Sequence, residues 1–180
     1  EEDQGYVYVA LQLPNASSLQ RTAEAAHKVE AVLAKTPGVQ GYTSVIGFSL
    51  QSFVYNTYSA FFFVNLKPWS ERTASGEQFQ AIKDHLAREL KKIPDGNSFS
   101  FAPPSIPGVG TAGGFTFVLE DRAGKDVAFL ADNVNKFMDA AKKRPELTSV
   151  STTFLPNVPQ VFVKVDRDKV LKQGVNLGDV

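Results

Sequence analysis

Two stretches with helical periodicity, each flanked by short runs of aromatic and β-branched residues, most constrain how this chain can fold. Residues 19–33 and 79–93 carry apolar side chains at steps of three and four, which predicts two amphipathic helices. Ser17 and Ser75 open capping-box spacings at their starts. Together with the surrounding strands, this gives the order βαββαβ, the split βαβ arrangement of ferredoxin-like domains. The expected strands are 6–13, 39–48, 58–66 and 98–102.

A segment rich in proline and glycine follows this first unit and predicts a boundary. Residues 103–114 contain three Pro and four Gly, a composition typical of a linker. Helical periodicity returns after Asp126 and Asp166, and both aspartates are expected to cap helices. Further strands are expected at 115–119, 148–153 and 160–165.

The second half of the chain repeats the element order of the first. Thr43-Ser44-Val45 and Thr148-Ser149-Val150 are the same triplet, each in the expected second strand of its unit. We therefore expect an α+β fold with two ferredoxin-like βαββαβ units in tandem, the second incomplete, covering residues 1–110 and 111–180. Apolar residues resume in 174–180 as if another element were starting, so both ends are expected to be cuts in a longer protein.

Composition argues against several classes of function. The chain has no Cys, which rules out disulfides, thiolate metal sites and cysteine nucleophiles. Its 19 basic and 19 acidic side chains balance, so nucleic acid is not an expected partner. His27 and His85 occur singly on the two helices without metal-ligand spacing, so we expect no metal and no other cofactor. No nucleophile–base set is recognisable, so we expect no enzyme and no catalytic residue.

Two motifs resemble ligand sites but have simpler explanations. Residues 108–113 match the dinucleotide fingerprint GxGxxG, yet Pro107 precedes them and a strand is expected to follow, so we interpret them as a connector. Asp166 and Asp168 look like a carboxylate pair. A cap and a first-turn residue favoured by the helix dipole explain both.

The 14 Phe and 5 Tyr gather in a few short segments and give the main functional signal. Residues 48–58 hold four aromatic side chains without clear helix or strand periodicity, and exposed aromatics in a loop indicate a partner or ligand. Two interpretations stay open for the strand aromatics, namely hydrophobic core or an apolar pocket rimmed by a few polar groups. Alternation places these residues on shared strand faces: Tyr6, Tyr8 and Ala10, then Phe115, Phe117 and Leu119.

Six groups of motifs occur in an order shared with a known transporter family. They are Glu2-Asp3-Gln4-Gly5, Gln12-Leu13-Pro14, Gly47-Phe48, Phe63-Val64-Asn65-Leu66-Lys67-Pro68-Trp69 with Glu71-Arg72, Gly110-Thr111-Ala112-Gly113-Gly114-Phe115, and Val165-Asp166 leading to Gly174-Val175. In this order they resemble the periplasmic porter region of resistance-nodulation-division (RND) multidrug efflux pumps of the AcrB type. The resemblance covers essentially the whole chain.

The resemblance implies a place for each unit in a larger protein. Residues 1–110 would be the first porter subdomain of the C-terminal half, and 111–180 the opening part of the second, before the docking domain. The piece would be a soluble periplasmic portion of a proton-driven transporter in the bacterial inner membrane. The implied partners are hydrophobic or amphipathic small molecules, other protomers of a homotrimer, a periplasmic adaptor protein and an outer-membrane channel.

The resemblance also implies which residues contact substrates. Residues 47–57 resemble the switch loop between two drug pockets, and Ser151 falls where AcrB-like pumps have an arginine. An alternative stays open, namely a ferredoxin-like module without enzymatic activity whose aromatic face binds a protein partner. The expected substrate-binding residues are Tyr8, Ala10, Phe48, Leu50, Phe53, Phe63, Phe115, Phe117 and Leu119.

Overall fold

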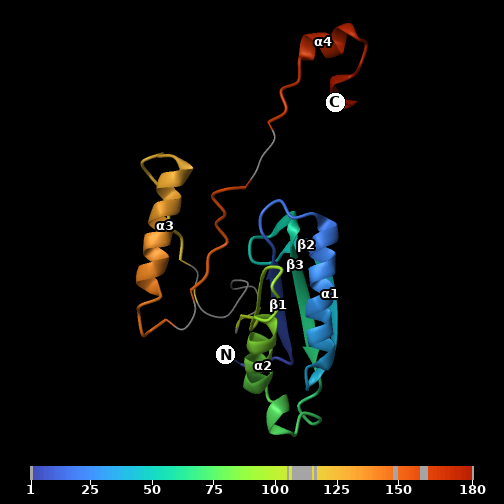
Figure 1. Cartoon of the computed structure of the whole chain (residues 1–180), viewed down its shortest axis with the longest axis vertical. Helices are drawn as coiled ribbons and strands as arrows, with labels where there is room; N and C mark the ends of the chain where they lie inside the picture. Colours follow the sequence, from blue (N-terminus) through green and yellow to red (C-terminus); the bar gives the residue numbers. More distant parts are fainter. Residues whose placement is uncertain are drawn as a thin grey trace.

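The computed structural model describes residues 2–104, 106, 115, 117–147, 150–158 and 162–179 (Figure 1). Its N-terminal part follows the βαββαβ order expected from the sequence. A single 3-10 turn, Ser75–Glu77, precedes the second helix. The elements are β1 (Tyr6–Gln12), α1 (Leu19–Lys35), β2 (Val39–Ser49), β3 (Val54–Leu66), α2 (Phe79–Leu90) and β4 (Asn97–Phe101).

The strands of this part form one sheet in the order β2-β3-β1-β4, with every neighbouring pair antiparallel. β2 and β3 make a hairpin, while β1 lies between β3 and β4 and pairs with both. This arrangement is that of a ferredoxin-like domain, so the expected mixed α and β fold class is confirmed. The tandem division at residue 110 stays a prediction.

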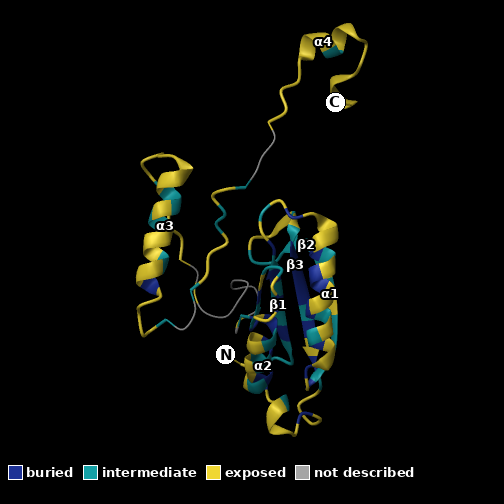
Figure 2. Ribbon diagram, viewed as in Figure 1, coloured by how far each residue is buried: buried dark blue, intermediate teal, exposed yellow. Residues whose placement is uncertain are grey.

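Both helices pack on the same face of the sheet (Figure 1). Val29 of α1 and Ile82 of α2 are fully buried, as are Val9 of β1 and Phe62 of β3. Successive strand side chains point to opposite faces, so every second residue of β1 joins this core. Figure 2 shows buried residues concentrated between the sheet and the two helices. Neither α1 nor α2 covers the opposite face.

The helix starts differ in detail from the capping boxes expected at Ser17 and Ser75. Ser18 caps α1, and its Oγ accepts a hydrogen bond from the backbone N–H of Arg21 at 3.2 Å. Ser17 is buried and instead donates to the carbonyl oxygen of Pro14 at 2.7 Å. Ser75 begins the 3-10 turn, and α2 starts after Gln78 without a side-chain cap. Both capping-box assignments were therefore wrong.

The β2–β3 hairpin is longer than the sequence indicated. β3 begins at Val54 rather than Tyr58, and a short turn at residues 50–53 joins it to β2. Pairing with β2 supplies backbone hydrogen bonds that the mixed composition of this stretch does not reveal. Near the turn, Gly47 has φ +90° and lies at a shift in strand register, a conformation that glycine adopts readily.

Beyond residue 115, the described residues form two helices, α3 (Val127–Ala141) and α4 (Arg167–Lys172), and a 3-10 turn at Leu177–Asp179. The predicted caps are confirmed, because Asp126 accepts from the N–H of Phe129 at 2.8 Å and Asp166 from that of Lys169 at 3.1 Å.

The strands expected in this second part do not form among its described residues. Residues 117–119, 150–153 and 162–165 are irregular. A strand needs a neighbour to pair its backbone groups, and no described strand runs beside these segments. Residues 116, 148–149 and 160–161 of those predicted strands lie outside the described residues.

No helix among the described residues has the length and apolar content needed to cross a membrane.

Candidate functional site

The face of the sheet opposite the helices carries aromatic side chains from three strands. Strand register explains their grouping, because Tyr8 of β1 is paired with Phe63 of β3 on one side and Phe101 of β4 on the other. Ala10 is likewise paired with Phe61 and Phe99. We call this set the aromatic face: Tyr6, Tyr8, Phe61, Phe63, Phe99 and Phe101.

The rings of the aromatic face contact one another. The ring of Tyr6 stacks on Phe63 with centroids 5.0 Å apart. The ring of Tyr8 lies 5.2 Å from Phe61 and 5.5 Å from Phe101. Phe61 is buried yet lies outside the helix-side core, so the neighbouring rings contribute to its cover. Burial, with a smaller contribution from Tyr6, raises the pKa of the Tyr8 phenol above its ordinary value.

A second aromatic group lies at the tip of the β2–β3 hairpin. The ring of Phe48 is 5.1 Å from Tyr55 and 6.3 Å from Phe53. Phe53 is 64% exposed and Tyr55 84% exposed. Phe53 also has φ 54°, in the left-handed region that is uncommon for a bulky residue. The hairpin tip thus presents apolar rings to solvent at a strained turn.

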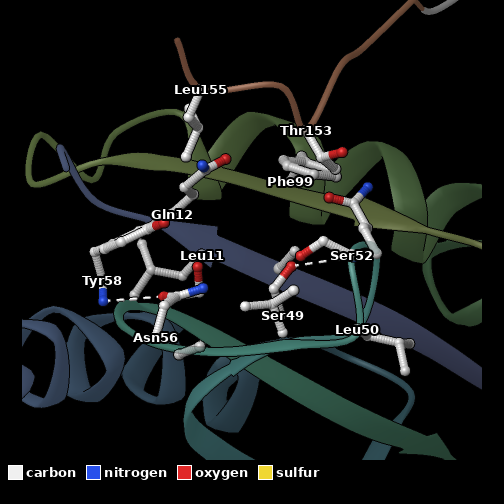
Figure 3. A pocket seen from close by; sticks show the side chains of 15 residues that line it. Leu11, Gln12, Ser49, Leu50, Ser52, Asn56, Tyr58, Phe99, Thr153 and Leu155 are labelled. Carbon is white, nitrogen blue, oxygen red and sulfur yellow. Dashed lines mark hydrogen bonds between the residues drawn. The ribbon is translucent and has the colours of Figure 1, made fainter. Parts of the chain in front are cut away.

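A cavity of about 170 Å³ lies between this hairpin and the end of the aromatic face (Figure 3). Residues 49–52, 10–12 and 58–60 line it together with Phe99. Thr153 and Leu155 lie across it from Ser49 and Asn56 (Figure 3). Nearby, the side-chain amide of Asn15 donates to the carbonyl oxygen of Asn157 at 3.2 Å, which holds this later segment beside the first unit.

The structure brings together some of the predicted substrate-binding residues. Tyr8 and Phe63 are in ring contact on the aromatic face, and Ala10 lies between that face and the cavity. Leu50 lines the cavity.

Other predicted residues lie elsewhere. Phe48 and Phe53 contact each other on the hairpin. Phe117 stacks on Phe137 of α3 with centroids 4.9 Å apart and lines no part of the cavity. Phe115 and Leu119 are exposed and also do not line it.

Sequence reasoning missed several residues at this site. Phe61, Phe99 and Phe101 belong to the aromatic face but are not among the expected substrate-binding residues. A signal was available, because Phe61 and Phe63 are two residues apart, as are Phe99 and Phe101, which puts each pair on one strand face. Asn56 lines the cavity but gave no such signal, because its position there depends on where the β2–β3 hairpin turns.

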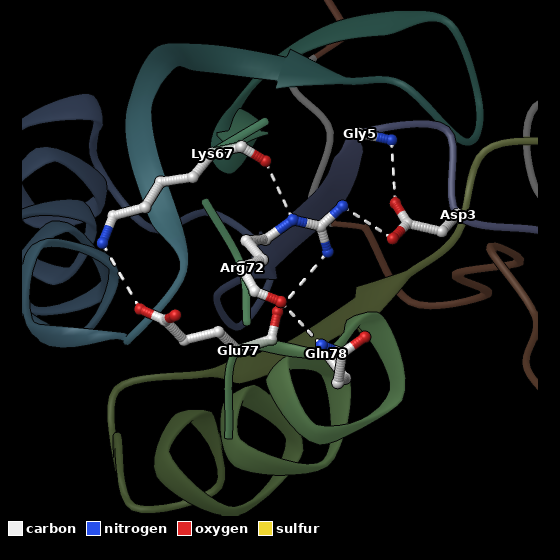
Figure 4. Close-up of polar contacts among 6 residues, drawn as sticks. All are labelled: Asp3, Gly5, Lys67, Arg72, Glu77 and Gln78. Carbon is white, nitrogen blue, oxygen red and sulfur yellow. Dashed lines mark hydrogen bonds and ion pairs between the residues drawn. The ribbon is translucent and has the colours of Figure 1, made fainter. Parts of the chain in front are cut away.

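A polar cluster at the other end of the sheet joins two of the sequence motifs (Figure 4). Arg72 is only 3% exposed, and its guanidinium donates to the carboxylate of Asp3 at 2.7 Å and to the carbonyl oxygen of Lys67 at 2.8 Å. The carbonyl oxygen of Glu77 accepts a third bond at 3.4 Å. These partners satisfy the buried charge, so the cluster is a structural one.

The described residues contain no group of three or more His, Asp or Glu that could hold a metal ion. His27 Nδ1 lies 2.9 Å from the carboxylate of Glu30 on the exposed side of α1. The GxGxxG stretch at 108–113 lies outside the described residues.

Comparison with known proteins gives consistent matches over the full sequence. The profile of the AcrB/AcrD/AcrF family matches residues 1–180. The multidrug export protein AcrF of Escherichia coli K12 is 34% identical over the whole chain, and the toluene efflux pump membrane transporter TtgB of Pseudomonas putida DOT-T1E is 30% identical. The multidrug resistance protein MdtF of Escherichia coli K12 is 31% identical. The chain spans only 18% of AcrF, 17% of TtgB and 18% of MdtF.

Proposed function

The chain belongs to the AcrB/AcrD/AcrF family, and from that premise we propose that it lines part of the substrate path of a multidrug efflux transporter. The complete protein would be a proton-driven pump of the inner membrane that works as a homotrimer, with this portion in the periplasm. A periplasmic adaptor and an outer-membrane channel would complete the assembly. The chain itself would have no enzymatic role.

The observation that carries this proposal is the aromatic face running up to the cavity. Phenyl and phenol rings offer broad, rigid apolar surface with few side-chain torsions, so they bind ligands of different shape at little entropic cost. α1 and α2 pack on the other side of the sheet, so neither helix covers this face. Hydrophobic or amphipathic small molecules are the substrates that such a surface suits.

The hairpin tip favours a second role in protein contact. Phe53 and Tyr55 are mostly exposed, and exposed aromatic groups of this kind occur at protein interfaces. Neighbouring protomers or the adaptor are the partners expected here. Loss of assembly in a Tyr55→Ala variant, with the sheet intact, would support this second role over ligand binding.

Substitution in the full-length transporter tests the proposed path. Phe63→Ala removes a ring that contacts Tyr6 and Tyr8 without opening the helix-side core. We expect cells that depend on this pump to lose resistance to some hydrophobic compounds while the protein level stays unchanged. Susceptibility to a broad compound panel and an immunoblot measure the two effects.

Two further variants make this test specific. Phe129→Ala, on α3 and away from the sheet, is the matched control and should leave susceptibility unchanged. Phe117→Ala tests another of the expected substrate-binding residues, and we expect a partial loss of export. Unchanged susceptibility in Phe63→Ala across the whole panel would contradict the assignment of the aromatic face.

A further inference from the structure

The side chain of Gln4 joins two parts of the first unit that are far apart in the sequence. Its Nε2 group donates to the carbonyl oxygen of Pro104 at 2.9 Å, 100 positions further along the chain. Its Oε1 atom accepts from the hydroxyl of Tyr6 at 3.1 Å. Tyr6 belongs to the aromatic face, and Pro104 lies in the segment that follows β4. Gln4 therefore connects the aromatic face to the exit of the first unit.

The two partners fix the orientation of the Gln4 amide. The carbonyl oxygen of Pro104 can only accept, so the NH₂ group of the amide faces it. The Oε1 atom then faces Tyr6, which has a hydroxyl proton to donate. If the amide turned over, two acceptors would face each other at Pro104. Each partner thus holds the amide in the orientation that the other bond requires.

The exit segment depends on this donor because it contains two consecutive prolines. Pro103 and Pro104 have no backbone N–H, so only packing or their carbonyl oxygens can hold them to the sheet. Pro103 is buried, whereas Pro104 is half-buried. Among the described residues, the Gln4 amide is the only hydrogen-bond donor to either carbonyl oxygen. Packing therefore fixes the chain as far as Pro103, and Gln4 determines its direction beyond that point.

The backbone at Gln4 is held from both sides. The carboxylate of Asp3 accepts from the N–H of Gly5 at 2.9 Å and from buried Arg72 at 2.7 Å (Figure 4). The carbonyl oxygen of Gly5 accepts from the N–H of Leu66, at the end of β3, at 2.9 Å. The main chain is thus tied to two other segments and does not follow the side chain. A change at one end of the Gln4 amide therefore acts on the bond at its other end.

Tyr6 in turn is held by the rings of the aromatic face. Its ring stacks on Phe63 with centroids 5.0 Å apart and planes 15° apart, and it lies 5.5 Å from the ring of Tyr8. Such ring pairs have preferred arrangements, so the neighbours define where the ring of Tyr6 lies. A phenol is rigid, so any displacement of this ring also displaces its hydroxyl.

We propose that Gln4 is a clasp, made of its bonds to Tyr6 and Pro104, that couples the aromatic face to the exit of the first unit. While Tyr6 stays stacked, the amide is oriented and Pro104 is held. When the ring of Tyr6 is displaced, the amide loses its orientation and the exit is released. Coupling is reciprocal, so a change at the exit also shifts Tyr6.

The clasp gives ligand contact a structural consequence. A molecule that separates Tyr6 from Phe63 would open the clasp and change the direction in which the chain leaves the first unit. This step rests on the proposed function, because it takes the aromatic face as the surface that contacts substrates. The clasp itself depends only on the contacts described above.

Removing one hydroxyl tests the clasp. In the ¹⁵N-labelled 180-residue chain, NMR measures hydrogen exchange of the Gln4 NH₂ group and the ¹H–¹⁵N NOE of Ile106, which lies just beyond Pro104. Tyr6→Phe keeps the ring but removes the donor to Gln4. We expect exchange to rise about fivefold, as for the loss of one hydrogen bond, and the NOE to fall. Tyr55→Phe removes an exposed hydroxyl at the hairpin tip and should change neither.

Two further variants test the coupling and its direction. Phe63→Ala removes the ring against which Tyr6 stacks and leaves both bonds of the clasp in place, so it should produce the same two changes. Phe48→Ala removes a ring of the hairpin tip and is its matched control. Gln4→Glu keeps an acceptor for Tyr6 but has no donor for Pro104. It should lower the NOE of Ile106 while the ring resonances of Tyr6 stay unchanged.

Three results would overturn this inference. Unchanged exchange of the Gln4 NH₂ group in Tyr6→Phe, or an exit as mobile in the unmodified chain as in Gln4→Glu, would rule out the clasp. Release by Tyr6→Phe but not by Phe63→Ala would rule out its coupling to the aromatic face. None of these results bears on export in Phe63→Ala cells, which tests the proposed function. Conversely, unchanged export in those cells would contradict the substrate path and leave the clasp measurable.

Discussion

Arg72 shows how a single buried residue ties distant stretches of this chain together. Asp3 before β1, the end of β3 and the 3-10 turn before α2 all supply acceptors to its guanidinium (Figure 4). Asp3 and Arg72 are 69 residues apart, so the sequence could identify them only as members of separate motifs. The planar, five-donor shape of arginine explains why one side chain can bridge them.

Removing this cation should destabilise the first unit strongly. Arg72→Met removes the counter-charge of the Asp3 carboxylate, which keeps only the N–H of Gly5, and the donor to two carbonyl groups. The free energy of unfolding should therefore fall by about 3 kcal/mol, at the lower end for buried pairs because Asp3 is partly exposed. Urea denaturation followed by far-UV circular dichroism measures it. Arg122→Met breaks an exposed pair with Glu120 and should cost less than about 1 kcal/mol. Equal losses in the two variants would show that burial of Arg72 is not the cause.

At the scale of elements, Glu30 links α1 to β2. Its carboxylate accepts from Ser44 Oγ at 2.6 Å and lies 2.9 Å from His27 Nδ1. Burial alone would raise the pKa of Glu30, but the hydrogen bonds from Ser44 and His27 outweigh it and lower this pKa below its ordinary value. The ionised carboxylate is therefore the form that the folded chain favours.

This link predicts a pH dependence of stability. Because the pKa of Glu30 is lower in the folded chain than in the unfolded one, its contribution is complete above the unfolded pKa of about 4.5 and is lost as pH falls through the folded value. Glu30→Gln should flatten the fall of the unfolding free energy on acidification below about pH 4.5. Urea titrations at several pH values measure the slope. Glu24 is exposed on the same helix, so Glu24→Gln should leave this slope unchanged. A flattening of similar size in Glu24→Gln would rule out the Ser44 contact as the cause of the effect.

At the scale of the whole molecule, the elements that could be predicted from the sequence are those whose apolar face is buried in the structure. The periodicity of α1 and α2 is strong because both helices pack on one sheet, and the same burial explains β1 and β3. Residues 162–165 have equally strand-like composition, yet Phe162 is 90% exposed and unpaired. Strand propensity measures how well a side chain fits a half-buried sheet surface. No described strand lies beside residues 162–165, so they have no such surface to join.

The site was predictable to a similar extent. Alternation identified Tyr8 and Ala10, and the family resemblance added Phe63. Phe99 joins the cavity only because β4 pairs with β1 in a register that sets Ala10 beside it. A register between strands separated by most of the unit cannot be read from either strand alone, which is why this residue was missed.

The uneven packing predicts uneven protection of backbone amides. Among the described residues of the second part only Ala141 is buried, whereas β1 and β3 lie in the core. Amide hydrogens of α3 should therefore exchange about a hundredfold faster or more than those of Val9 and Phe62, because local opening of α3 breaks few contacts. Hydrogen exchange followed by NMR measures both sets in one sample. Equal protection of α3 and β1 would mean that the two parts unfold together.

Because side chains alternate along β3, its two faces contribute to different properties of the molecule. Phe62 points into the core and stabilises the fold, whereas its neighbours Phe61 and Phe63 belong to the aromatic face. Under the proposed function, substitutions at the latter positions would change which molecules are accepted while the fold persists. Because α1 and α2 cover only the other face of this sheet, ordinary point mutations could alter the aromatic face and leave the helix-side core intact.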